Sequence, residues 1–186
     1  MTTPMSPMDY PAGATPTGDG IVVGSGPVTV DAYIDFMCPF CRRFELSAGP
    51  TLSSMVADGQ ISVVYHPMSF LDAASTTRYS SRAGAASGCA SDGGRFAGYT
   101  HALFANQPPE GGPGLSDDEL VKLGASAGLA GEAFESCLRA GRYLDWPSHV
   151  TSVATARGVT ATPTVLVGGV PVAPDGPTVA AAVSAL

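Results

Sequence analysis

Residues 34–44 read IDFMCPFCRRF, and this stretch decides which fold the sequence predicts. Two cysteines, Cys38 and Cys41, stand three positions apart within it. The preceding residues 27–36 (PVTVDAYIDF) are rich in β-branched and aromatic side chains, which is typical of a buried strand. Residues 39–57 carry apolar side chains at helical spacing. We therefore expect the cysteine pair where a strand ends and a helix begins.

Three kinds of site use two cysteines at this spacing: a zinc site, a structural disulfide and a redox couple. A zinc site needs four ligands, usually including a second close pair, but the other two cysteines lie 48 residues apart and the three histidines are scattered. A disulfide that closes a loop of two residues restricts the unfolded chain very little, so it adds little stability. The redox couple explains the position of the pair best.

Cys38 is expected to be the N-cap of the helix, with Pro39 at the favoured first helical position. The backbone N–H groups of Phe40 and Cys41 would then point toward the Cys38 sulfur. Together with the positive end of the helix dipole, they would favour thiolate over thiol. Cys41 lies one turn further into the helix, where its thiol can resolve a mixed disulfide formed at Cys38.

The rest of the chain predicts an α/β domain that is interrupted by helices. Helical periodicity fills residues 72–157, and strands return after it. The other predicted strands and the last helix cover residues 21–23, 60–68, 162–169, 170–173 and 175–186. We expect residues 21–71 and 158–186 to form one domain, with 72–157 as a helical insertion. Residues 1–20, rich in Pro, Gly and Thr, are expected to be a flexible leader.

A second signal is TATPTVLV, residues 160–167, where Pro163 stands at the entrance to a predicted strand. Base rates favour a trans bond for any single X-Pro pair. The alternative is a cis bond between Thr162 and Pro163 that packs against the cysteine pair. Thr162 would then offer unpaired backbone groups to a substrate strand.

The motif DFMCPFCRRF, the helical block and GVTATPTVLVGG, in this order, resemble the DsbA family of thioredoxin-fold thiol oxidoreductases. The resemblance covers about residues 20–186 and implies a thioredoxin fold with a helical insertion. It implies that Cys38 is the exposed nucleophile, that Cys41 resolves and that Pro163 is cis. Substrate is expected to contact Thr162, Pro163, Pro39 and Phe40.

The chain departs from the pattern of the family at two positions. Strongly oxidising members often carry histidine directly before the second cysteine, where this chain has Phe40. Many thioredoxin-fold proteins bury an acid six residues before the first cysteine, where this chain has Ala32. Asp31 and Asp35 are near, but we expect both on the strand face opposite Tyr33 and assign neither a role in proton transfer.

Cys89 and Cys137 both fall on predicted helices of the insertion. Free cysteines are often small buried hydrophobic residues, which is one interpretation of this pair. The other is a disulfide that staples the insertion, as in some actinobacterial proteins that resemble this one, and we favour it. Closing a loop of about 49 residues would add on the order of 4 kcal/mol in the chain-entropy model.

Composition narrows the classes of function. The formal net charge is −7, which argues against a nucleic-acid-binding surface. No run of 18 apolar residues predicts a membrane span, and no cleavable signal is visible. We expect a monomer with no metal and no other cofactor.

The leading hypothesis is an extracytoplasmic thiol:disulfide oxidoreductase that introduces disulfides into reduced exported polypeptides. Its export or anchor segment is expected to lie outside this sequence. The resemblance implies re-oxidation by a membrane protein similar to DsbB or to vitamin K epoxide reductase. The same pair could instead serve a disulfide reductase or isomerase, and the fold could be a peptide-binding or chaperone module without catalysis.

Overall fold

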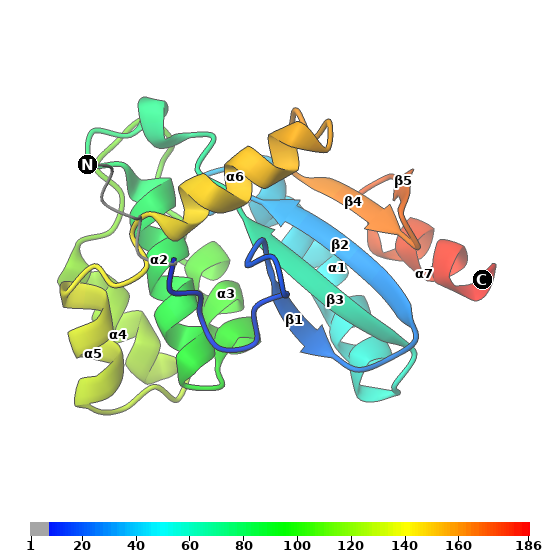
Figure 1. Cartoon of the computed structure of the whole chain (residues 1–186), viewed down its shortest axis with the longest axis horizontal. Coiled ribbons are helices and arrows are strands. Elements are labelled where there is room, and N and C mark those ends of the chain that lie inside the picture. Colours follow the sequence, from blue (N-terminus) through cyan, green and yellow to red (C-terminus); the bar gives the residue numbers. More distant parts are fainter. Residues whose placement is uncertain (1–7) are drawn as a thin grey trace, which may run out of the picture.

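The computed structural model describes residues 8–186, and a five-stranded mixed sheet forms its centre (Figure 1). The strand order is β1-β3-β2-β4-β5. β2 runs parallel to β3 and antiparallel to β4, while β1 and β5 form the two edges as antiparallel neighbours of β3 and β4. The strands are β1 (Ile21–Gly24), β2 (Val28–Ile34), β3 (Ile61–Pro67), β4 (Thr164–Val167) and β5 (Val170–Val172).

The register of β2 brings two distant segments together. Within the sheet, Tyr33 pairs with His66 of β3 on one side and with Thr164 of β4 on the other. The last three residues of β2, 32–34, are buried, whereas its first half is only partly buried and carries the polar residues Thr29 and Asp31. Because Thr164 directly follows Pro163, this register sets Pro163 beside the end of β2, from which the chain continues to Cys38.

Helices cover both faces of the sheet and form a separate group beside it. α1 lies behind the sheet in Figure 1 and α6 crosses in front of it, while α7 packs on α1, β4 and β5. No helix within residues 8–186 is long and apolar enough to cross a membrane. The helices are α1 (Pro39–Ala57), α2 (Tyr79–Asp92), α3 (Phe96–Ala105), α4 (Asp117–Ser126), α5 (Glu132–Arg139), α6 (Trp146–Ala156) and α7 (Gly176–Ser184), with a short 3-10 helix, η1 (Asp72–Ala74), before α2.

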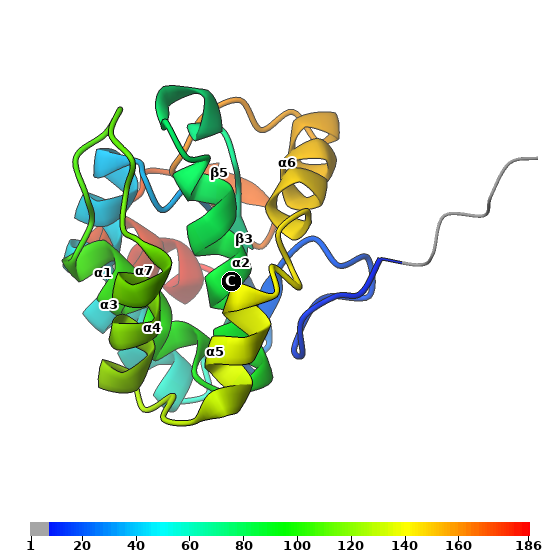
Figure 2. The same ribbon diagram turned by 90° about the vertical axis from the view of Figure 1, so that its left-hand side faces the viewer.

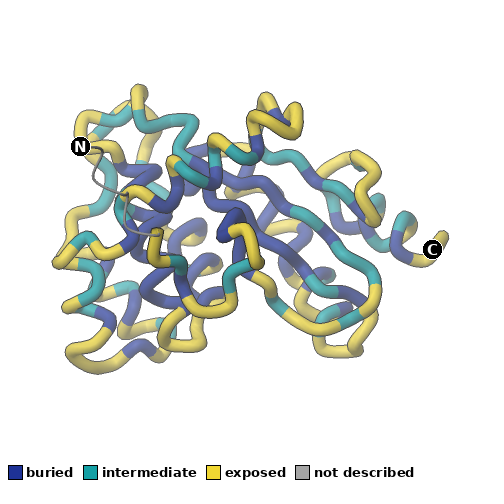
Figure 3. Tube along the Cα trace, in the orientation of Figure 1, coloured by how far each residue is buried: buried dark blue, intermediate teal, exposed yellow. Residues whose placement is uncertain are grey.

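The helical group is built around α2, which packs against α3, α5 and α6 (Figure 2). Its sequence, YSSRAGAASGCASD, consists mostly of small side chains, and nearly all of them are buried. Small side chains let neighbouring helices approach closely: a Cβ at Gly84 would lie 2.5 Å from Pro147, and one at Gly88 would lie 3.0 Å from Tyr143. Figure 3 shows this burial running from α2 into the sheet. The predicted thioredoxin fold with a helical insertion is confirmed.

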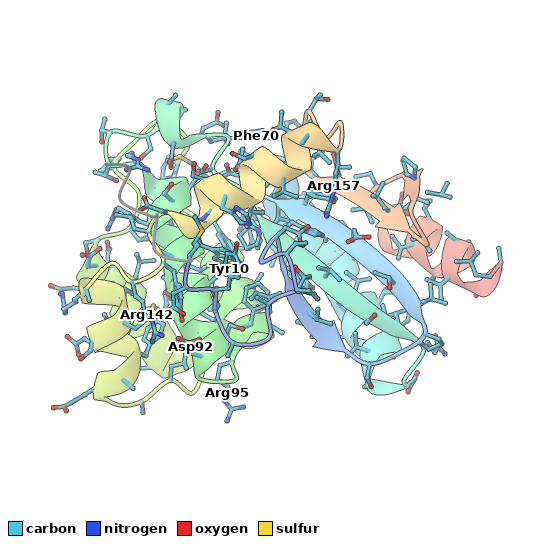
Figure 4. All side chains as sticks on the ribbon, in the orientation of Figure 1. Tyr10, Phe70, Asp92, Arg95, Arg142 and Arg157 are labelled. Carbon is cyan, nitrogen blue, oxygen red and sulfur yellow. A yellow bond between two sulfur atoms is a disulfide. The ribbon has the colours of Figure 1, made fainter. Side chains whose placement is uncertain are left out.

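The N-terminal segment differs from the expected flexible leader. Residues 1–7 of the expected leader lie outside the described residues, but residues 8–20 run across the front of the molecule and contact it (Figure 1). The indole Nε1 of Trp146 donates to the carbonyl of Gly18 at 2.7 Å. Tyr10, which is labelled in Figure 4, stacks on His149 with ring centroids 5.3 Å apart. The Pro- and Gly-rich composition of this segment is typical of a linker. Composition alone does not reveal that side chains of α6 bind the segment.

Candidate active site

The cysteine pair lies at the start of α1, directly after the central strand. Cys38 is the N-cap of α1 and Pro39 is its first residue. The backbone N–H of Cys38 donates to the carbonyl of Asp35 at 3.0 Å, which closes the turn that follows β2. Cys38 and Cys41 are both free and buried, whereas the Phe40 side chain beside them is 60% exposed. The site therefore presents an aromatic ring to solvent next to a shielded pair of thiols.

The two thiols have opposite electrostatic environments. The hydrogen bond from the Cys41 thiol, opposed by burial, lowers the pKa of Cys38 from 9.0 to about 6. The backbone N–H groups of Cys41 and Phe40 and the side chain of Thr162 also favour the thiolate. Burial, followed by the hydrogen bond to Cys38 and the charge of Cys38, raises the pKa of Cys41 far above its usual range. At neutral pH the reduced pair is therefore a Cys38 thiolate beside a Cys41 thiol.

The cis-proline loop contacts this pair. The Thr162–Pro163 peptide bond is cis, and the Cys38 Sγ lies 3.5 Å from the Thr162 carbonyl oxygen across 124 residues of sequence. Thr162 and Pro163 are half-buried, while Pro39 is exposed. The structure thus brings the predicted nucleophile together with Thr162 and Pro163, and sets Pro39 at the rim.

Cys89 and Cys137 lie apart from this site, within the helical group. They form a disulfide with an S–S distance of 2.03 Å that joins α2 to α5. Cys89 is 2% exposed and Cys137 is half-buried. The structure therefore contains the disulfide between α2 and α5 that we favoured, and not two free cysteines.

Gln107 is a site residue that the sequence analysis missed. It lies in the loop after α3, and its Nε2 donates to the backbone carbonyls of Phe36 and Cys38, both at 3.0 Å. A neighbouring contact runs the opposite way, since the Arg42 Nε of α1 donates to the Phe104 carbonyl of α3 at 3.0 Å. The helical insertion therefore holds the turn that carries Cys38, through groups that no local pattern in NQPPEGG indicates.

The expected placement of Asp31 was wrong. His66 of β3 stacks on the Tyr33 ring with centroids 4.1 Å apart, and its Nε2 lies 2.8 Å from Asp31 Oδ1. Asp31 and Tyr33 thus reach one imidazole from the same strand face, as alternate residues of a strand do. Asp35 follows the last residue of β2, so the strand period does not govern where its side chain points.

Comparison with known proteins places this geometry in a family. Residues 17–184 match the family model described as Thioredoxin. The structure of reduced disulfide bond oxidoreductase DsbG from Mycobacterium tuberculosis is 35% identical, with a TM-score of 0.73, over 83% of this chain and 80% of that one. Oxidised DsbA from the same organism is 34% identical, with a TM-score of 0.72, over 82% and 84%. MdbA from Actinomyces oris, 18% identical with a TM-score of 0.78 over 95% and 92%, shares the fold.

A curated relative is much longer than this chain. The serine/threonine-protein kinase PknE of Mycobacterium tuberculosis is 37% identical over 135 residues, which cover 68% of this chain and 24% of the kinase. The chain therefore spans about a quarter of the length of the curated relatives that it matches. The family match covers nearly all of this chain, and two DsbA-type structures are more than 30% identical over at least 80% of their length. The chain belongs to the thioredoxin family, among its DsbA-like thiol-disulfide oxidoreductases.

Proposed function

We propose that this protein is an extracytoplasmic thiol:disulfide oxidase that introduces disulfide bonds into exported polypeptides through the Cys38–Cys41 couple. The observation that carries the proposal is the asymmetry of the pair, with the Cys38 pKa lowered to about 6 and the Cys41 pKa raised. A low pKa makes Cys38 a good leaving group, and a shielded Cys41 suits the role of resolving thiol.

The reaction begins with the oxidised enzyme, in which Cys38 and Cys41 form a disulfide. A substrate thiolate attacks the Cys38 sulfur, a new substrate–Cys38 bond forms and the Cys38–Cys41 bond breaks. The Cys41 thiolate leaves and takes a proton from solvent, because its buried site disfavours the charge. A second substrate thiolate then attacks the substrate sulfur and releases Cys38 as the thiolate. The substrate loses two electrons and the enzyme gains them.

The direction of exchange follows from which redox form the site stabilises. The hydrogen bonds and the helix N-terminus at Cys38 act on the thiolate, which is present in the reduced enzyme and absent from the disulfide. Stabilising the reduced form makes the oxidised form a stronger oxidant. This argument favours an oxidase over a reductase or isomerase that uses the same two cysteines.

Substrate is proposed to dock across the mouth of the site. Thr162 and Pro163 would receive an extended segment of the substrate beside Cys38, while Pro39 and the exposed ring of Phe40 would contact its side chains. Pro39 follows Cys38 in the chain and the Thr162 carbonyl lies 3.5 Å from its sulfur, so a substrate cysteine held between these two pairs would meet the Cys38 sulfur. The core formed by 21–71 and 158–186 would carry the chemistry.

A location outside the cytosol is supported by the second disulfide. Cys89 and Cys137 form a disulfide at a sequence separation of 48, and stable disulfides of this kind persist in oxidising compartments. Reduced enzyme must pass its two electrons on, and we propose a membrane oxidant similar to DsbB or to vitamin K epoxide reductase as the acceptor.

Disulfide transfer to a reduced, unfolded ribonuclease tests the proposal. Oxidised enzyme is expected to lose its disulfide as the ribonuclease gains one, and Cys38→Ser protein is expected to be inactive. Cys41→Ser protein, mixed with a disulfide-bonded peptide, should accumulate a mixed disulfide at Cys38 because no thiol resolves it. Equal behaviour of the two variants would contradict the assigned roles. If mild reduction followed by alkylation at acidic pH labelled neither thiol preferentially, a peptide-binding module without catalysis would be favoured.

A further inference from the structure

Asp35 is a buried carboxylate in the turn between β2 and Cys38. The residue is 0% exposed, and its side chain accepts three hydrogen bonds. The donors are the backbone N–H of Met37 at 2.9 Å, the backbone N–H of Leu71 at 2.9 Å and the Ser80 hydroxyl at 2.6 Å. These donors come from three segments: the turn itself, the chain after β3, and α2 of the helical insertion.

The backbone of Asp35 contacts both cysteines. Its N–H lies 3.4 Å from the Cys41 sulfur, and its carbonyl accepts the Cys38 N–H at 3.0 Å. A single residue therefore holds the nucleophile, the resolving thiol and, through Ser80, the insertion. Movement of the carboxylate would move the backbone that positions both sulfurs.

The contacts of the carboxylate indicate that it is charged at neutral pH. Two of its three hydrogen-bond partners are backbone N–H groups, which can only donate, and the Ser80 hydroxyl donates to it as well. Burial, chiefly, raises the pKa of Asp35 to about 6, and the negative charge of the Cys38 thiolate raises it as well. Tyr79 of α2 is also coupled to this charge, and its hydroxyl stays neutral because burial raises its pKa well above its usual range.

We propose that Asp35 is a positioning residue that also sets the redox poise of the couple. Its carboxylate fixes the turn before Cys38, and its negative charge opposes the Cys38 thiolate, so the couple is less oxidising than the helix N-terminus alone would make it. The inference rests on the proposed exchange at Cys38–Cys41 but not on its direction. Like charges in a site of low dielectric constant couple strongly enough to alter a thiol equilibrium severalfold.

Thermodynamic reciprocity provides a test in the unmodified protein. If the Asp35 charge disfavours the Cys38 thiolate, the thiolate must disfavour the Asp35 charge by the same free energy. The ¹³C chemical shift of the Asp35 carboxyl, measured against pH, gives its titration midpoint. We expect this midpoint to lie at least about 0.5 pH unit lower in oxidised than in reduced protein. At 1.36 kcal/mol per pH unit, this shift corresponds to a threefold change in the protonation equilibrium of Asp35. The same midpoint in both redox forms would overturn the proposal, whether or not the protein is an oxidase.

Asp35→Asn removes the charge while it keeps the size of the side chain. Asp72→Asn is the matched control, because this substitution removes the same charge without touching the turn. Asp72 accepts hydrogen bonds from the Ser81 N–H at 2.9 Å and from the Ser81 hydroxyl. In glutathione buffers, Asp35→Asn is expected to shift the exchange equilibrium at least about threefold toward the reduced enzyme, or about 14 mV at 29.6 mV per tenfold. Asp72→Asn is expected to shift it less than that.

A third variant separates charge from structure. Ser80→Ala removes a donor that lowers the Asp35 pKa, so more of the carboxyl is protonated at neutral pH, and the equilibrium is expected to shift toward the reduced enzyme by less than in Asp35→Asn. The proposal fails if folded Asp35→Asn protein keeps the wild-type equilibrium, if Asp72→Asn shifts it equally, or if Ser80→Ala shifts it further than Asp35→Asn does. Near-ultraviolet circular dichroism checks that each variant is folded. If Asp35→Asn does not fold, the ¹³C titration of the unmodified protein decides.

Discussion

Reduction of the Cys38–Cys41 couple should stabilise the fold, and the gain should grow with pH. The Cys38 pKa falls from 9.0 to about 6 on folding. A group with a depressed native pKa contributes stability that is complete above its unfolded value and is lost as the pH falls through its native value. The gain in reduced protein should therefore be absent at pH 5 and rise between about pH 6 and pH 8.

The size of the gain follows from the width of this window. Two pH units at 1.36 kcal/mol each amount to about 2.7 kcal/mol. The site opens to solvent beside Phe40, so screening reduces the gain to about 1.5–2.7 kcal/mol. For a chain of this length, each kcal/mol shifts the melting temperature by about 2–4 °C, which predicts a rise of about 3–11 °C. Above about pH 8.5 the gain should decline, because Cys41 then ionises in the unfolded chain but not in the native site.

Calorimetric melting of oxidised and reduced protein from pH 5 to pH 8 measures this difference. Other buried acids titrate in both redox forms, so most of their contribution cancels in the comparison. Mass spectrometry must show that mild reduction opens Cys38–Cys41 and leaves Cys89–Cys137 closed. Reduced Cys38→Ser protein is the control and should lack the rise, because its hydroxyl does not ionise. A difference that is independent of pH, or oxidised protein that melts higher at pH 8, would refute thiolate stabilisation.

Three further predictions concern the surroundings of the pair. Phe40→His loses little packing, since Phe40 is 60% exposed, and should lower the Cys38 pKa and make the couple more oxidising; a more reducing variant would contradict this. Gln107→Ala removes two hydrogen bonds to backbone carbonyls and should lower the free energy of unfolding in urea by about 1–3 kcal/mol; a loss below about 0.5 kcal/mol would show that these two bonds are dispensable. Replacing Cys89 and Cys137 by serine should cost on the order of 4 kcal/mol and leave the thiolate absorbance titration of Cys38 in place, whereas a shifted titration would connect the staple to the redox site.

Local sequence patterns were sufficient for the elements that build the site. A strand followed by Cys38 and Pro39 predicts an N-cap, because only the first turn of a helix accommodates proline without losing a hydrogen bond. The helix predicted at 39–57 has those bounds in the structure. The S-x-x-E pattern of Ser116 and Glu119 likewise forms the capping box that begins α4.

Contacts between distant segments that belong to no motif were beyond what the sequence could predict. Gln107 and Ser80 hold the active-site turn from the insertion, and neither belongs to a motif that shows where its side chain will point. Residues 8–20 have the composition of a linker, yet they lie against α6 because Trp146 supplies a donor to their backbone. These interactions depend on how the insertion docks on the sheet.

The reduction potential of the Cys38–Cys41 couple tests the central claim most directly. Equilibration with glutathione buffers, read out by alkylation and mass spectrometry in protein that lacks Cys89 and Cys137, gives this potential. A thiolate stabilised by the helix N-terminus, but with Phe40 in place of histidine, predicts a potential between about −270 and −120 mV, the values of thioredoxin and DsbA. A potential at or below about −270 mV would contradict the oxidase function and favour a reductase.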